Sequence, residues 1–289
     1  MRGVSFRAGE GFTSIMGPNG SGKTTVLSMV AGALKPSRGS IRVCGLDVWG
    51  EESEAVRARR LIGFAPQDMP FKERLTGFEN LVIMGMLRGM GFLESRREAR
   101  RVLELVGLAE HGDRRVVTYS GGMRRRLAIA SSIIHEPEVL VLDEPSSGLD
   151  PVAREEIWSL IERVGAGRVV VYSTHISQEA EAHSGNVLIF HGGRVVAEGA
   201  PVELIRRYAP KPRVIVVHEP LSELPVIDGL RGQAIDETTS VYEVEDASAW
   251  LPRVIEGFIS LGVQVERVEV RRPGLEEVYF RVTGSRLEV

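Results

Sequence analysis

Apolar and polar residues follow one another along most of the chain in blocks that predict strands alternating with helices. Apolar positions recur at helical spacing at residues 23–34, 79–88, 95–106, 125–134, 151–164 and 178–182. Short, mainly apolar runs predict strands at residues 11–16, 40–43, 61–65, 139–142, 168–173 and 187–190. These alternating elements predict an α/β fold with a mostly parallel sheet and a helical insert at about residues 68–118.

A change in composition at residues 209–212 suggests a domain boundary. Pro210 and Pro212 oppose the continuation of a helix there and favour an extended linker. Beyond the linker, residues 247–259 have the pattern of an amphipathic helix, and strands are predicted at residues 213–218, 240–244 and 263–270. We therefore expect a large domain over residues 1–208 and a small α+β accessory domain over residues 213–289.

The composition excludes several classes of protein. The formal net charge of −3 and the sequence pI of about 6.1 create no basic field, so we expect no nucleic-acid partner. No apolar run approaches the roughly 18–20 residues that cross a bilayer. Cys44 is the only cysteine, which excludes a disulfide framework, and residues 1–10 lack the features of a secretory signal. The cytoplasm is the expected compartment.

A glycine-rich loop lies between the first predicted strand and the first predicted helix. It fits the pattern G-x-x-x-x-G-K-[ST] at Gly17, Pro18, Asn19, Gly20, Ser21, Gly22, Lys23 and Thr24. Glycines allow successive backbone amides and the positive end of the helix to surround phosphate groups. The Lys23 ammonium suits the β and γ phosphates of a nucleotide, and the Thr24 hydroxyl suits Mg²⁺. We expect this loop and the adjoining Thr25 to bind ATP.

Two further motifs indicate a nucleotide site when they are considered together with this loop. Asp143 and Glu144 follow an apolar strand, where they would hold the metal and activate the attacking water, although such a pair alone more often caps a helix. Ser120, Gly121 and Gly122 precede a predicted helix, and alone they are an ordinary helix cap. One chain thus has two helix N-termini suited to phosphate, which one nucleotide uses most simply if two chains face each other.

Together these motifs resemble the ATP-binding subunits of ABC transporters. That family has a phosphate loop, a Q-loop glutamine, a Ser-Gly-Gly signature, an acidic strand end, a D-loop aspartate and a switch histidine, and all six occur here in that order. The glutamine is Gln67, after Phe-Ala-Pro, the aspartate is Asp150 in Ser-Gly-Leu-Asp, and the histidine is His175, after Ser-Thr. The resemblance extends over about residues 3–208 and implies a P-loop ABC ATPase core.

The resemblance also implies ligands and partners. Two ATPase subunits, identical or related, would pair head to tail, with each MgATP between one phosphate loop and the partner's Ser120 and Gly122. Gln67 would contact Mg²⁺ or the attacking water, and its expected companions at the metal are Thr24 and Asp143. His175 would reach the γ-phosphate and hold Glu144, and Asp150 would couple the two sites across the interface. Taken singly, these three residues have plainer readings, as a loop residue, a histidine after a strand and a helix cap.

One departure from the family pattern and two further similarities refine this picture. Relatives carry an aromatic residue upstream that stacks on adenine, and neither Phe6 nor Phe12 stands at the matching place. We therefore expect either a longer reading frame or weaker binding of adenine. The signature form that begins at Tyr119 and the tail at residues 272–284 resemble exporters of drugs, antibiotics and natural products whose ATPase is a separate polypeptide.

This similarity implies export through a separate integral membrane permease. The chain would then be a peripheral subunit at the cytoplasmic face of the cell membrane. In relatives, the stretch that matches residues 68–81 receives a helix of the permease, and Phe71 and Leu75 are the contact candidates.

A soluble, non-transport ABC ATPase of the translation or DNA-repair type is the main alternative. Such proteins generally have two ATPase domains, an iron-sulfur cluster or a long coiled coil, and this sequence shows none of these. A nucleotide-dependent regulator without turnover is a third possibility, but it gives Glu144 and His175 no evident purpose.

Overall fold

The chain forms two compact units. The computed structural model describes residues 1, 3–221, 223–227 and 229–287. The first unit comprises Met1–Pro201 with Leu287, and the second comprises Val202–Arg286. The division therefore falls after Pro201, the first residue of helix α8 (Pro201–Tyr208), whereas the sequence placed the boundary after Tyr208.

A six-stranded sheet forms the centre of the first unit. Its strands lie in the order β4-β5-β6-β1-β7-β8, and all neighbours are parallel except β8, which runs antiparallel to β7. The strands are β1 (Gly11–Met16), β4 (Ile62–Ala65), β5 (Val139–Asp143), β6 (Val169–Thr174), β7 (Asn186–His191) and β8 (Arg194–Gly199). The mostly parallel α/β fold is thus confirmed. Strand β8 was not predicted, because its apolar run, residues 195–197, is only three residues long.

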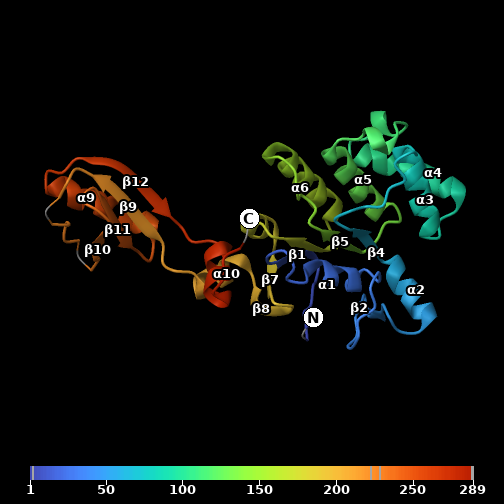
Figure 1. Ribbon diagram of the computed structural model, residues 1–289, viewed down its shortest axis with the longest axis horizontal. Coiled ribbons are helices and arrows are strands. Elements are labelled where there is room, and N and C mark those ends of the chain that lie inside the picture. Colours follow the sequence, from blue (N-terminus) through green and yellow to red (C-terminus); the bar gives the residue numbers. More distant parts are fainter. Residues whose placement is uncertain (2, 222, 228, 288–289) are drawn as a thin grey trace. The chain divides into compact units, whose positions relative to one another are not determined.

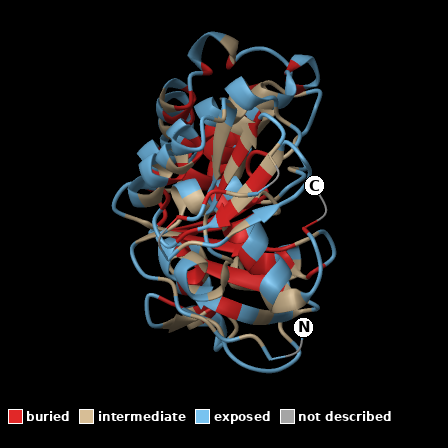
Figure 2. Cartoon of the chain, turned by 90° about the vertical axis from the view of Figure 1, so that its left-hand side faces the viewer, coloured by how far each residue is buried: buried red, intermediate tan, exposed pale blue. Residues whose placement is uncertain are grey.

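Helices cover both faces of this sheet, which explains why the central strands are so apolar. All five residues of β5 are buried, and successive side chains point to opposite faces. Val139 and Val141 pack with Val26 of α1 (Lys23–Val30), whereas Leu140 and Leu142 pack with helices on the other face, α5 (Gly121–Ile133) and α6 (Pro151–Gly165). Figure 1 shows these helices on opposite sides of the sheet, and Figure 2 shows the buried residues concentrated along the strands.

Helices α3 and α4 form the insert that the sequence predicted. Helix α3 begins with a capping box, in which the Thr76 hydroxyl accepts a hydrogen bond from the Glu79 amide and the Glu79 carboxylate accepts one from the Thr76 amide. The buried Asn80 side chain bonds both backbone groups of Lys72 at 2.9 and 3.1 Å, which fixes the segment after Gln67. The elements are α3 (Gly77–Leu87), α4 (Phe92–Leu105), η1 (Ala109–His111) and η2 (Val116–Thr118).

The remaining elements of the first unit surround the sheet. A short hairpin of β2 and β3 leads into α2, which precedes β4, and α7 lies between β6 and β7. Their bounds are β2 (Arg42–Val43), β3 (Leu46–Asp47), α2 (Glu52–Arg60) and α7 (Ser177–His183). Among the residues described, no helix combines the length and apolarity that crossing a membrane requires.

The second unit contains an antiparallel sheet of four strands in the order β10-β11-β9-β12. Its core consists of Val214, Val216 and Tyr242 from the sheet, packed against Val254 and Phe258 of α9. Residues 272–284, which the sequence analysis noted as a tail, contain α10. The elements are β9 (Arg213–His218), β10 (Gly232–Ala234), β11 (Thr239–Glu243), α9 (Ala247–Ser260), β12 (Val265–Arg271) and α10 (Leu275–Thr283).

Candidate active site

Four neighbouring parallel strands deliver the expected site residues to one edge of the sheet. Strands β4, β5, β6 and β1 are adjacent and parallel, so their carboxyl ends lie together. Gln67 follows β4, the pair Asp143 and Glu144 stands at the end of β5, His175 follows β6, and the phosphate loop follows β1. Ligands bind at this edge in open α/β sheets.

The phosphate loop packs tightly against neighbouring backbone. A Cβ atom added at Gly17 would lie 2.4 Å from the carbonyl oxygen of Phe190 in β7, so only glycine fits. The Gly17 amide donates to the carbonyl oxygen of Thr174 at 3.3 Å, which joins the loop to the end of β6. Gly22, at the start of α1, has a φ of 105°, a conformation that side chains rarely tolerate. Thr24 is exposed and Thr25 is half-buried.

Lys23 lies at the centre of the site. Its buried ammonium donates to the carbonyl oxygens of Gly17 at 2.8 Å and Pro18 at 3.1 Å, and it lies 3.4 Å from Glu144 Oε1. Burial lowers the pKa of Lys23, while the charges of Glu144 and Asp143 act in the opposite direction. The lysine and the catalytic carboxylate predicted from separate motifs are therefore direct neighbours.

Ser173 holds both acidic residues, although no motif singled it out. Its buried hydroxyl donates to Asp143 Oδ1 at 2.5 Å and accepts a hydrogen bond from the Glu144 amide at 2.9 Å. Glu144 has a φ of 46°, which is uncommon for a residue with a side chain and is associated with functional sites. Asp143 Oδ2 is buried and has no hydrogen-bond partner in the described part of the chain. One oxygen of Asp143 is thus fixed and the other is available.

His175 lies beside the second carboxylate. Its Nδ1 atom is 3.4 Å from Glu144 Oε1, the same oxygen that faces Lys23. This contact lacks the geometry of a hydrogen bond, since Nδ1 has no such partner among the described residues. Glu144 is therefore flanked by an ammonium group and an imidazole.

The side chain of Gln67 is exposed, and its backbone is tied to the signature helix. Arg125 Nη1 of α5 donates to the Gln67 carbonyl oxygen at 3.2 Å. Burial lowers the pKa of Arg125, and the charges of Asp68, Asp143 and Glu144 oppose that shift. The arginine therefore lies in the electric field of Asp143 and Glu144.

The two neighbours of Arg125 point elsewhere. Arg124 pairs with Glu73 at 2.9 Å and Arg126 pairs with Glu156 at 2.8 Å. Arg124 and Arg125 thus contact the loop between β4 and α3, and Arg126 contacts α6.

The signature residues lie at the N-terminus of α5. The Ser120 hydroxyl accepts a hydrogen bond from the Met123 amide at 3.2 Å and caps the helix. Gly121 is exposed and Gly122 is half-exposed, and a Cβ atom on either would meet open space. In the described part of the chain, no hydrogen bond or ion pair joins these three residues to the phosphate loop. Within one chain, the two anion-suited helix ends remain separate.

Asp150 caps α6, as its plainer reading expected. Its exposed carboxylate accepts hydrogen bonds from the amides of Val152 and Ala153, each at 3.1 Å, and Pro151 occupies the first helical position. This arrangement fixes the start of α6 without using all of the carboxylate's acceptor positions.

The few oxygen atoms available at the strand ends suit Mg²⁺ shared with a nucleotide. They do not suit a metal ion that is coordinated by protein side chains alone. The described residues contain no cluster of three or more His, Cys, Asp or Glu side chains that could hold a metal ion. Mg²⁺ is typically bound through one or two protein oxygens together with phosphates and water. The unpartnered Asp143 Oδ2 and the exposed Thr24 hydroxyl fit that requirement.

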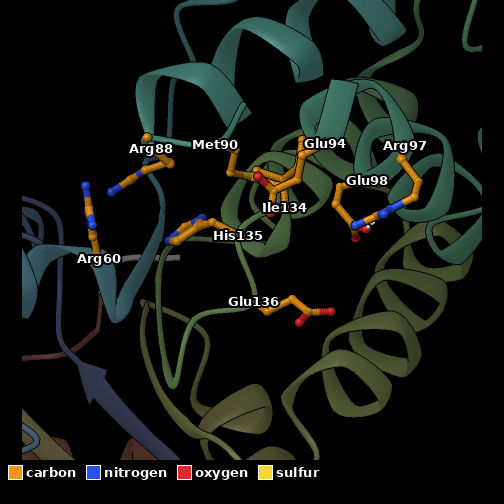
Figure 3. Close-up of a pocket in the computed structure, with 10 residues that line it drawn as sticks. Arg60, Arg88, Met90, Glu94, Arg97, Glu98, Ile134, His135 and Glu136 are labelled. Atoms are coloured by element: carbon orange, nitrogen blue, oxygen red, sulfur yellow. Dashed lines mark hydrogen bonds and ion pairs between the residues drawn. The ribbon is translucent and has the colours of Figure 1, made fainter. Parts of the chain in front are cut away.

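A separate hollow lies between the helical insert and the loop after α5. Its volume is about 280 Å³. Figure 3 shows Arg60, Arg88 and His135 at one end of it, and Glu94 and Glu98 toward the other. None of the expected site residues lines this hollow.

Comparison with known proteins identifies the family. Residues 1–147 match the ABC transporter family. The chain is 37% identical to the daunorubicin resistance ATP-binding protein DrrA3 of Streptomyces coeruleorubidus, over 98% of this chain and 90% of that protein. It is 30% identical to the linearmycin resistance ATP-binding protein LnrL of Bacillus subtilis, over 99% of this chain and 94% of that protein.

A solved structure extends the comparison to three dimensions. The ATP-binding cassette MJ0796, in a dimeric post-hydrolysis state bound to ADP and Pi, is 28% identical with a TM-score of 0.62. The match covers 68% of this chain and 88% of that one. The resemblance inferred from the motifs is confirmed, and the non-transport alternative is not favoured. The chain belongs to the ABC transporter family and is an ATP-binding, ATP-hydrolysing subunit of a transporter of that family.

Proposed function

We propose that this subunit pairs with a second ATPase subunit upon binding ATP, and that the cycle of pairing and hydrolysis powers export through a separate membrane permease. The observation that carries the proposal is the separation of the two helix N-termini suited to phosphate. Ser120, the exposed Gly121 and the half-exposed Gly122 have no bond to the phosphate loop of their own chain among the described residues. A partner's nucleotide is the ligand that fits them.

Each residue at the strand ends has a role in hydrolysis that its position supports. Glu144 orients or deprotonates the attacking water, since Ser173 holds its backbone at the strand end and its carboxylate lies 3.4 Å from both Lys23 and His175. Lys23 stabilises the negative charge of the β and γ phosphates, and this requires its ammonium to move from the carbonyl oxygens of its own loop toward the nucleotide. His175 holds the Glu144 carboxylate and contacts the γ-phosphate.

Thr24, Gln67 and Asp143 would hold the metal ion. When bound, Mg²⁺ would neutralise phosphate charge and favour the displacement. The backbone carbonyl of Gln67 already bonds Arg125, which leaves its exposed side chain able to turn toward the metal or the water. Gln67 thereby links this site to the segment that follows it.

The assignment to export rests on the named relatives, which are resistance proteins, and a further relative is a Nod factor export ATP-binding protein. In this proposal the permease binds the segment at residues 68–81, and the subunit lies at the cytoplasmic face of the cell membrane. Phe71 and Leu75 are both partly buried, and Phe71 packs against the core that includes the signature helix. Movement of this segment would thus be transmitted to the helix that carries Ser120.

The test is affinity purification of a Glu144→Gln variant from membranes with MgATP present, followed by mass spectrometry. A variant that binds but does not hydrolyse ATP accumulates in the paired state, so we expect a second ATPase chain and a polytopic membrane protein. A matched sample of the variant without nucleotide is expected to recover less of the second ATPase chain. Recovery of ribosomes or DNA instead would contradict the transport assignment.

The permease contact has its own test. A Phe71→Asp or Leu75→Asp substitution is expected to reduce recovery of the membrane protein while nucleotide affinity, measured by calorimetry, stays within a few-fold of the unmodified subunit. Unchanged recovery with both variants would place the permease contact elsewhere.

A further inference from the structure

A buried carboxylate outside all of the family motifs lies in the first turn of α7. Glu179 is only 5% exposed. Its two carboxylate oxygens accept hydrogen bonds from two buried hydroxyls: Ser146 Oγ donates to Oε1, and Thr174 Oγ1 donates to Oε2 at 2.7 Å. Arg154 Nε lies 3.6 Å from Oε1, and the Tyr172 hydroxyl donates to the Glu179 carbonyl oxygen at 3.1 Å. Two hydroxyls and one arginine thus hold the carboxylate, and the Tyr172 hydroxyl holds the backbone of the same residue.

The first of the two hydroxyls belongs to the loop that carries the catalytic carboxylate. Ser146 stands two residues after Glu144 and four before Asp150. The same loop closes on itself, since the Ser147 amide donates to the Glu144 carbonyl oxygen at 3.2 Å and the Leu149 amide donates to the Ser146 carbonyl oxygen at 3.3 Å. The hydrogen bond to Ser146 therefore fixes the whole turn between Glu144 and Asp150.

The second hydroxyl belongs to the segment that carries the switch histidine. Thr174 immediately precedes His175. Its hydroxyl also accepts a hydrogen bond from the Ile176 amide at 3.0 Å, so both its donor and an acceptor position are used. Through its carbonyl oxygen the same residue receives the Gly17 amide of the phosphate loop. Glu179 thus hydrogen-bonds the residue that joins the segment of His175 to the phosphate loop.

Only a charged group with two oxygens serves both hydroxyls in this way. Hydrogen bonds to a carboxylate are shorter and stronger than neutral ones. A buried carboxylate is costly unless it is paired, and Arg154 supplies the positive charge. A smaller or apolar residue here would leave two buried hydroxyls without an acceptor and free to turn.

We propose that Glu179 is a positioning residue for ATP hydrolysis. It holds the loop that begins at Glu144 against the segment that carries His175, and it thereby maintains the 3.4 Å contact between these two side chains. The inference rests on the proposed roles of Glu144 and His175 in hydrolysis. A second consequence is that Arg154, one turn after Asp150 on α6, connects the interface end of that loop to the same carboxylate.

The test begins with steady-state ATPase kinetics of full-length Glu179→Ala and Glu179→Gln variants. We expect Glu179→Ala to lower kcat by about tenfold or more and to leave KM for MgATP within about threefold, since loss of orientation slows the chemical step more than binding. Glu179→Gln keeps the size but only one of the two acceptor oxygens and no charge, so its kcat is expected to lie between those of Glu179→Ala and the unmodified subunit. A Glu138→Gln variant is the matched control, because this exposed carboxylate precedes β5 at the opposite end of the sheet.

A double-mutant cycle with His175→Ala separates positioning from a general loss of structure. If Glu179 acts through His175, then Glu179→Ala reduces kcat by less than about twofold in the His175→Ala background. If the double variant instead loses kcat by the product of the two single-variant factors, the two residues act independently and the proposal is overturned. Ser146→Ala, which removes one hydroxyl and keeps the carboxylate, provides a milder variant should Glu179→Ala unfold, and it is expected to lower kcat by a few-fold with no added loss beside His175→Ala.

Glu144→Gln in the same assay distinguishes a failure of the proposed hydrolysis mechanism from a failure of the positioning role of Glu179. If Glu144→Gln turns over ATP normally, the proposed mechanism itself is wrong. If Glu144→Gln and His175→Ala both lower kcat but Glu179→Ala keeps the unmodified kcat, the mechanism stands and the positioning role of Glu179 is refuted.

Discussion

Replacement of Ser173 by alanine removes the single hydroxyl that orders both acidic residues of the site. Ser173 is fully buried, at 0% exposure. Its hydroxyl donates to Asp143 Oδ1 at 2.5 Å and accepts a hydrogen bond from the Glu144 amide at 2.9 Å. Ser173→Ala therefore deletes one charge-assisted bond and leaves one buried amide without its acceptor.

The expected cost follows from these two bonds. A hydrogen bond to a charged group contributes about 1.5–3 kcal/mol, and a buried donor left without a partner costs about 1–3 kcal/mol. Since Asp143 Oδ2 already lacks a partner among the described residues, little compensation is available nearby. We expect Ser173→Ala to lower the free energy of unfolding of the first unit by about 2.5–6 kcal/mol.

Ser131→Ala is the matched control for equilibrium urea unfolding followed by circular dichroism. Ser131 is also buried, at 2% exposure, but its hydroxyl has no hydrogen-bond partner in the described part of the chain. Its removal is expected to change the free energy of unfolding by less than about 1 kcal/mol. Equal unfolding midpoints for the two variants would refute the reasoning, because the number of bonds lost would then not determine the cost.

Two further changes test other features of the site and its surroundings. Gly17→Ala places a Cβ atom 2.4 Å from the backbone oxygen of Phe190, so the loop must shift, and calorimetry is expected to show ATP affinity at least about tenfold weaker. Gly9→Ala is the control, because an added Cβ atom there meets open space and the residue has no positive φ. Equal losses in the two variants would contradict the steric account. Burial, and then the charge of Arg88, lower the pKa of His135 from 6.5 to about 4 (Figure 3). Because the unfolded state binds the proton at higher pH than the folded state, stability is expected to fall by about 1–3 kcal/mol as the pH drops from 6.5 toward 4. Thermal unfolding of a His135→Gln variant is expected to depend less on pH over this range, and an unchanged slope would show that other groups are responsible.

The sequence allowed the main elements of the ATPase core to be predicted because their signals are local. The buried strand at Val139–Asp143 is a continuous apolar run, and the phosphate loop has a defined pattern between a strand and a helix. The resemblance implied that His175 holds Glu144 beside the phosphates that Lys23 binds, and these three residues do meet, because the parallel strands β1, β5 and β6 end at the same edge. Periodicity and motif order were sufficient for this part.

The residues that hold the catalytic groups in place could not be predicted in this way. Ser173 is one of two small polar residues at the end of a mainly apolar strand, and Glu179 resembles any acidic residue in a first helical turn. Their roles depend on partners that are about 30 residues away in sequence, such as Asp143 and Ser146. Strand β8 was missed for a related reason, because its pairing with β7 rather than its own composition makes it a strand.

The central claim is that Glu144 activates the water that attacks ATP. Steady-state ATP turnover of the Glu144→Gln subunit, compared with the unmodified subunit at saturating MgATP, tests it most directly. The account predicts a fall in kcat of about 100-fold or more, with MgATP affinity within a few-fold, since a positioned general base contributes about 10²–10⁴ to the rate. Turnover near that of the unmodified subunit would contradict it.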